Sequence, residues 1–486
     1  MIDSLEAWCA AALESARKAG AEYADVRAGV AREESISTAD ETVESLDAGE
    51  SAGIGLRILK DGFWGFAGCD RLDPASAAAL AAPAMAAAAA ARAAGGDRSP
   101  FTPAPPATGR WESPAAIDPF SVPREKKLEL LFAAARAMHG AAKISRAKGS
   151  LTASRETRFF ASTAGHALQQ TRTLCGGGIV AIAAGDGDYQ TRAYPSSFGG
   201  NYAAAGWEFI EAMKLVEEAP RCAEEAVALL AAAPCPRLDG TTLILGSAQL
   251  ALQVHESCGH ATELDRALGW EVSLAGSSFL TPDKRGQFRY GSPLVNLTAD
   301  STLPGSIGSF GWDDEGTAAR RTPLVREGIF VDYLSNIETA AQTGFRNSGC
   351  MRAENAAHLP IIRMINVSLE PGKAGTLADL IADTKDGIFI DSNRSWSIDD
   401  RRVNFQFSCE YSRRIENGKL TTLYKNPLYT GITPKFWGGL DAICGPSEWK
   451  LWGLPNCGKG DPMQAMGVGH GAAPARFRGV DVRSAK

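Results

Sequence analysis

The chain has 486 residues, which is long enough for two domains of ordinary size. Hydrophobic residues make up 45% and charged residues 22%, as in soluble globular proteins, and the formal net charge is −6. Because lysine and arginine form no basic stripe and no run of about 18–20 apolar residues is uninterrupted, we expect no nucleic-acid partner and no membrane partner.

The cysteines indicate a reducing compartment. There are ten, at irregular spacing and without a CxxC pair, so we expect free thiols and a cytoplasmic location. The first residues, MIDSLEAWCAAALESARKAG, are amphipathic and predict the first helix of a domain, not a secretory signal.

Strands are predicted directly after this first helix. Apolar residues alternate around Val26 and again around Ile54, as in half-buried strands. Asp61 and Gly62 separate two apolar runs, and a glycine at this position favours the positive φ of a tight turn. The pattern therefore predicts a β-hairpin.

Helices and connectors complete the first half. The alanine-rich segment 73–96 predicts a helix, with a kink or break at Pro83, and the segment 201–234 predicts another helix. The segment CPRLDG predicts a turn, and the apolar run TTLILG that follows it predicts a new strand. We therefore predict an N-terminal domain over residues 1–236 and a strand-rich C-terminal domain over residues 237–486.

The segment LQVHESCGHATELD contains residue types that can bind a metal ion and transfer protons. His255 is followed by Glu256, and His260 lies five residues after His255. In a straight α-helix, positions five apart differ by about 140° in direction, so both imidazoles could not face one metal ion. Gly259 precedes the second histidine, and we expect it to adopt the left-handed conformation that ends a helix and turns His260 back.

Two histidines with an adjacent glutamate favour a zinc hydrolase. A catalytic zinc site uses about three protein ligands and a water, and Glu256 is placed to act as the general base. The spacing does not identify the third ligand. In the glycine-rich segment LPNCGKGD, the positive charge of Lys459 could favour the thiolate form of Cys457. The candidates are Cys258, Cys457, His358 and His470.

Four segments resemble conserved blocks of the TldD/PmbA family of metallopeptidases, in the same order. They are HESCGHATELD, GSFGWDDEGTAARRTPLVREGIFVDYL, AHLPIIRMINVSLEPG and NCGKGDPMQAMGVG, and the likeness extends to the N-terminal part. The resemblance implies an α+β fold in two domains, with the zinc site in the C-terminal one. It also implies His255, His260 and Cys457 as zinc ligands and Glu256 as the catalytic base, as in the metal-bearing TldD branch.

The resemblance further implies a function. We expect a zinc-dependent metallopeptidase that hydrolyses flexible or unfolded peptides, with Glu256 activating a zinc-bound water. The expected assembly is a homodimer or a heterodimer with a PmbA/TldE-type paralogue. The alternatives are a zinc hydrolase of non-peptide amides and a regulatory or binding subunit of a TldD/PmbA-type complex.

Two features of the sequence each have more than one interpretation. Cys258 lies beside the motif, where it could compete for the metal or become oxidised. The acidic run Asp313, Asp314 and Glu315 either orients a zinc ligand or forms a solvated turn that bends at Gly316.

Overall fold

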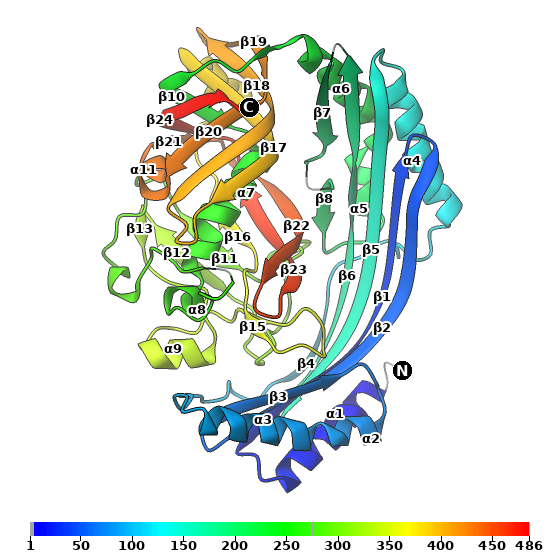
Figure 1. Ribbon diagram of the computed structural model, residues 1–486, viewed down its shortest axis with the longest axis vertical. Coiled ribbons are helices and arrows are strands. Elements are labelled where there is room, and N and C mark those ends of the chain that lie inside the picture. The colour runs from blue at the N-terminus through cyan, green and yellow to red at the C-terminus, as the bar shows by residue number, and fades with distance from the viewer. Residues whose placement is uncertain (1–3, 186, 198, 275, 486) are drawn as a thin grey trace.

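The computed structural model describes residues 4–185, 187–197, 199–274 and 276–485. Helices occupy 25% and strands 42% of the chain, so the predicted α+β class is confirmed. Figure 1 shows a long curved sheet with flanking helices, formed by the first half of the chain, beside a strand-rich body formed by the second half.

The first sheet has eight strands. Its central path is β3-β2-β1-β5-β6-β4, and β7 and β8 both pair with β6. Asp61 and Gly62 both have positive φ, 52° and 82°, so the predicted hairpin turn is confirmed between β2 and β3. The strands are β1 Tyr23–Ala39, β2 Thr42–Lys60, β3 Phe63–Cys69, β4 Thr108–Glu112, β5 Ile144–Ser162, β6 Ala167–Gly185, β7 Asp188–Tyr194 and β8 Asn201–Ala203.

Helices pack against this sheet near each of its ends and form two separate hydrophobic cores with it. Near one end lie α1 (Leu5–Lys18), α2 (Pro74–Ala79) and α3 (Ala81–Ala93), which pack through small apolar residues. Near the other end lie α4 (Arg124–His139), α5 (Glu208–Met213) and α6 (Leu215–Ala231).

Two helix predictions need correction in detail. The alanine-rich helix breaks at Leu80, while Pro83 lies in the first turn of α3, where a missing N–H is tolerated. The segment 201–234 begins as strand β8 and becomes helical only from Glu208.

The expected absence of a membrane partner stays a prediction. The helical segment Pro74–Ala93 is long and apolar enough to span a bilayer, but length and composition alone are weak evidence for a membrane span.

The second half is built on another eight-stranded sheet. Its path is β17-β10-β24-β20-β18-β19-β9, with β21 paired to β24. One large hydrophobic core holds this half together. The strands are β9 Ala233–Pro234, β10 Leu238–Leu245, β17 Asp386–Ile398, β18 Asn404–Glu416, β19 Lys419–Lys425, β20 Pro427–Ile432, β21 Leu440–Ile443 and β24 Ala475–Ser484.

Smaller elements complete this half. A four-stranded sheet, a two-stranded sheet and the β22–β23 hairpin contain β11 Leu297–Asp300, β12 Arg321–Arg326, β13 Ile329–Phe330, β14 Met351–Arg352, β15 Ile361–Ile362, β16 Val367–Leu369, β22 Lys450–Lys459 and β23 Gln464–Ala472. The helices are α7 Ser247–Val254, α8 Leu264–Ala267, α9 Ile337–Thr343, α10 Leu377–Ala382 and α11 Thr433–Gly438. The β22–β23 hairpin lies between the two bodies, and Asn201 of the first sheet accepts a hydrogen bond from Gly453 N at 2.8 Å.

Candidate metal centre

The predicted metal-binding segment is a buried helix that changes its pitch at His255. Helix α7 continues as a π-helical turn over His255–Gly259 and then as a 3₁₀ turn over His260–Thr262. The N–H of His260 donates to the carbonyl of His255, which is the i→i+5 bond of a π-turn. This wider turn brings positions five apart to one face, and the two imidazole centroids lie 4.8 Å apart.

The predicted conformation of Gly259 is wrong. Its φ and ψ are −57° and −62°, which is right-handed, so the π-turn and not a left-handed residue brings the histidines together. Glycine suits this position for a different reason. A Cβ here would lie 2.1 Å from the sulfur of Met364, so a larger residue would displace that buried side chain.

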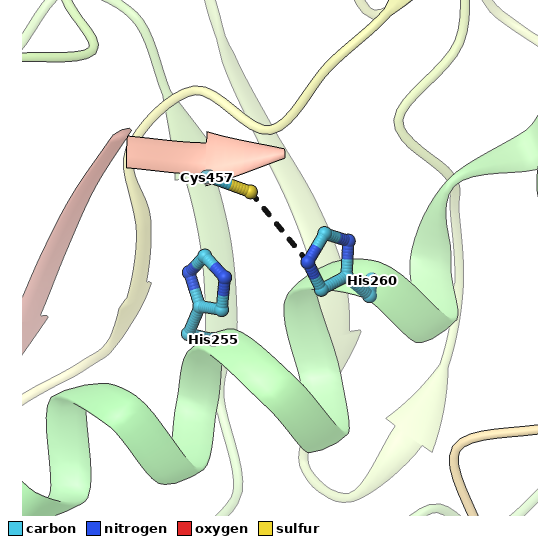
Figure 2. Close-up of side chains that lie close together, drawn as sticks. All are labelled: His255, His260 and Cys457. Atoms are coloured by element: carbon cyan, nitrogen blue, oxygen red, sulfur yellow. Dashed lines mark hydrogen bonds between the residues drawn. The ribbon is translucent and has the colours of Figure 1, made fainter. Parts of the chain in front are cut away.

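Cys457 reaches the same place from strand β22. The ligand atoms of His255, His260 and Cys457 all lie within 4.8 Å of one another, and the thiol sulfur is 3.6 Å from Nε2 of His260. Figure 2 shows the two rings rising from the helix toward the thiol on the strand. The pairing of β22 with β23 shifts register between Leu454 and Cys457, and such irregularities re-aim side chains in strands.

Hydrogen bonds set the tautomer of both imidazoles. His470 Nδ1 lies 2.8 Å from the carbonyl of Val367, so its N–H points there and its Nε2 accepts. The Nδ1–H of His255 therefore donates to His470 Nε2 at 2.8 Å. The Nδ1–H of His260 donates to Glu263 Oε2 at 2.9 Å. Each Nε2 therefore carries the lone pair that metal ligation requires, and that of His260 faces the Cys457 thiol.

Burial and charge favour the ligating forms of all three groups. Burial lowers the pKa values of His255 and His260, which keeps the imidazoles neutral. Burial alone would raise the pKa of the Cys457 thiol, but His260 and then Arg363 lower it below its ordinary value. Lys459 does not serve the thiol as expected, because it pairs with Asp265 at 2.8 Å.

The structure separates the alternative third ligands from this cluster. Cys258 is fully buried on another side, where its sulfur accepts from the hydroxyl of Tyr290 at 3.0 Å. Burial raises the pKa of the Cys258 thiol to about 12, so it stays protonated and is poorly suited to metal binding or oxidation. His358 bonds to Asn355 at 2.7 Å, and His470 supports His255 from behind.

Glu256 lies in the same turn and is mostly buried. Its Oε2 accepts a hydrogen bond from Nη1 of Arg402 at 2.8 Å. Sequence reasoning missed Arg402, Glu263 and the supporting role of His470. For Glu263, its place three residues after His260 was an available signal, because that spacing brings side chains together on a helical turn.

Both interpretations of the acidic run are wrong. Asp314 is buried and pairs with Arg158 of β5 at 2.9 Å, and Glu315 is buried and pairs with Arg57 of β2 at 3.0 Å. Asp313 accepts backbone hydrogen bonds from its own loop. The carboxylates of Asp314 and Glu315 join the two halves of the molecule, so the run is neither a solvated turn nor a support for the histidines.

The chain is similar to known metallopeptidases along nearly its whole length. Three family models match it: PmbA/TldA metallopeptidase domain 1 over residues 24–94, the central domain over 117–233 and the C-terminal domain over 239–483. The predicted division at residue 236 stays a prediction.

Two named relatives and one solved structure are also similar to this chain. A protein of Methanothermobacter thermautotrophicus named Metalloprotease is 29% identical over 465 residues, which is 95% of each chain. A protein of Saccharolobus solfataricus named Zinc metalloprotease TldD homolog is 26% identical over 199 residues, 41% of this chain and 42% of that one. The crystal structure of a putative modulator of a DNA gyrase from Thermotoga maritima has a TM-score of 0.78 at 16% identity, covering 98% of this chain and 99% of that one.

Proposed function

Because the chain belongs to the TldD/PmbA family of metallopeptidases, we propose that it is a zinc-dependent peptidase that hydrolyses flexible or unfolded peptides. The observation that carries the proposal is the cluster of His255, His260 and Cys457, whose ligand atoms lie within 4.8 Å of one another. The names of the relatives support the peptidase class, and one of them includes zinc.

The donor set fits zinc. Two neutral imidazoles and a thiol with a lowered pKa are borderline-soft donors, and three protein ligands leave a position open for water. His255, His260 and Cys457 would hold the ion, with His470 and Glu263 fixing the rings. When bound, zinc would lower the pKa of water and polarise the scissile carbonyl.

The side chains of this chain would handle the protons. Glu256 accepts the proton of the attacking water and returns it to the leaving amine, so that peptide cleavage consumes one water and leaves the glutamate unchanged. Glu256 directly follows His255 in the same π-helical turn and is mostly buried. Its partner Arg402 keeps one carboxylate oxygen in place.

The resemblance to the family supports a proposal for the substrate and the assembly. We propose that the peptide binds extended, with main-chain hydrogen bonds giving affinity and little sequence preference. We also propose a cytoplasmic homodimer, or a heterodimer with a PmbA/TldE-type paralogue, that binds neither nucleic acid nor membrane. Light scattering of the purified chain, alone and with the paralogue, tests the assembly.

Cleavage and metal content, measured together, test the function. The zinc-loaded chain should cut a panel of disordered peptides and leave simple non-peptide amides intact. Glu256→Gln should retain zinc and lose cleavage, because the amide cannot accept the proton. Cleavage of amides alone would favour the non-peptide hydrolase, and absence of any cleavage would favour a regulatory subunit. Retained cleavage by the Gln variant would remove Glu256 from the mechanism.

A further inference from the structure

A mostly buried ion pair joins Glu256 to a hairpin far away in the sequence. Nη1 of Arg402 lies 2.8 Å from Oε2 of Glu256, and the two side chains are 15% and 7% exposed. We propose that Arg402 is a positioning residue that fixes the Glu256 carboxylate for proton transfer. This inference rests on the proposed peptidase function.

The hairpin between β17 and β18 holds Arg402 in an unfavourable backbone conformation. Its φ is 65°, which is left-handed and strained for a residue with a side chain. The Asp399 carboxylate accepts hydrogen bonds from the N–H groups of Val403 at 2.8 Å and Asn404 at 3.0 Å. Thr433 donates its hydroxyl to the Arg402 carbonyl at 2.7 Å. The turn is therefore built to present this one side chain.

Protein stability does not explain the burial of this arginine. Burial lowers the pKa of Arg402, and the nearby Arg266 lowers it further. Both effects mean that the charged guanidinium is less favourable here than in water. Its Nε is buried and has no hydrogen-bond partner among the described residues. A charge kept in a place this costly is better explained by its contact with Glu256 than by stability.

Anchoring one oxygen is what a general base needs. A free glutamate side chain samples several rotamers, and each wrong one separates the carboxylate from the water that it must deprotonate. Arg402 donates to Oε2, which restrains the rotation of the carboxylate, and among the described residues it makes no such bond to Oε1. Glu263 gives His260 the same kind of support.

Arg401 offers a matched control. It precedes Arg402 in the same turn and is exposed. Its backbone carbonyl accepts a hydrogen bond from Phe279 N at 3.0 Å, and a side-chain change leaves this bond intact.

The kinetic test compares Arg402→Ala, Arg402→Lys and Arg401→Ala on a disordered peptide. Arg402→Ala should keep its zinc and its KM within about twofold, while kcat falls by about 10–100-fold. Arg402→Lys should recover part of kcat, and added guanidinium ion should partly rescue the Ala variant. Arg401→Ala should match the unchanged chain. An unchanged kcat in Arg402→Ala, or a rise in KM alone, would overturn the proposal.

A second test does not depend on turnover. Acetohydroxamate binds catalytic zinc and shares its hydroxyl proton with the base, so calorimetry of zinc-loaded protein reports the orientation of Glu256. Arg402→Ala and Glu256→Gln should each weaken binding, and the double variant should be no weaker than Glu256→Gln alone. Additive losses would overturn the positioning role. If the unchanged chain cuts no peptide, the proposed function fails, while this cycle still decides the role of Arg402.

Discussion

His470 Nε2 lies 2.8 Å from His255 Nδ1, although the two residues are 215 positions apart. Because His470 donates to the Val367 carbonyl, the hydrogen-bond chain fixes which nitrogen of His255 carries its proton. His470, itself a candidate third ligand, thus orients the ring of the candidate ligand His255. The metal affinity of this centre should depend on His470 without direct contact between His470 and the metal.

His470→Ala should lower zinc affinity by about 10–100-fold, because His255 loses the acceptor that orients its ring. His470→Gln should lose less, since an amide oxygen can replace the imidazole nitrogen. Competition with a chromophoric chelator measures both. His358→Ala, which affects a histidine bonded to Asn355, is the control and should bind zinc normally. Unchanged affinity in His470→Ala would show that the assigned tautomer is wrong.

Gly259→Ala should destabilise the fold by about 1–3 kcal/mol and reduce bound zinc, because its Cβ would overlap the Met364 sulfur at 2.1 Å. Adding Met364→Ala should restore the zinc by making room. Gly49→Ala is the control, since a Cβ there meets nothing within 4 Å. Thermal unfolding and zinc content are the measurements, and a fully stable, zinc-replete Gly259→Ala would contradict the packing argument.

Asp314→Asn should cost about 1–3 kcal/mol, because the buried Arg158 loses one of its two carboxylate partners, Asp314 and Glu156, at the contact between the two halves. The exposed pair of Lys18 and Glu14 is the comparison, and Glu14→Gln should cost far less, because water screens an exposed ion pair. Urea unfolding followed by fluorescence measures both. Equal, small costs would mean that the acidic run does not hold the halves together.

Glu410→Gln should change how stability depends on pH. Burial raises the pKa of Glu410 from 4.5 to about 7, against the opposing effect of Arg192. Since the folded state binds this proton more tightly, the stabilisation is present below about pH 4.5 and is lost as pH rises toward 7. The unchanged chain should therefore lose stability relative to the Gln variant across this window, by on the order of 3 kcal/mol. Parallel curves of unfolding free energy against pH would refute the shift.

The cluster of His255, His260 and Cys457 could be predicted because its residues stand in recognisable segments. His255, Glu256 and His260 stand together, and the glycine-rich segment around Cys457 is recognisable by its likeness to a family block. The geometry could not be predicted in the same way. An argument from angles per residue assumes one helix type, and the π-turn changes the pitch within the motif itself.

The missed residues act across the fold. Arg402 meets Glu256 over 146 positions, and the partners of Asp314 and Glu315 are arginines on strands of the other half. From the sequence alone, a run of three acidic residues predicts a solvated turn. Only the tertiary structure shows that Arg158 and Arg57 are buried beside it. Pairings of this kind depend on tertiary packing, which sequence periodicity does not report.

Zinc content of two cysteine variants tests the central claim most directly. The purified chain should hold about one zinc ion, and Cys258→Ala should hold as much, because that thiol lies outside the cluster. Cys457→Ala should lose most of the metal while its far-ultraviolet circular dichroism stays unchanged. If Cys258→Ala empties the protein and Cys457→Ala leaves it loaded, the metal centre described here is wrong.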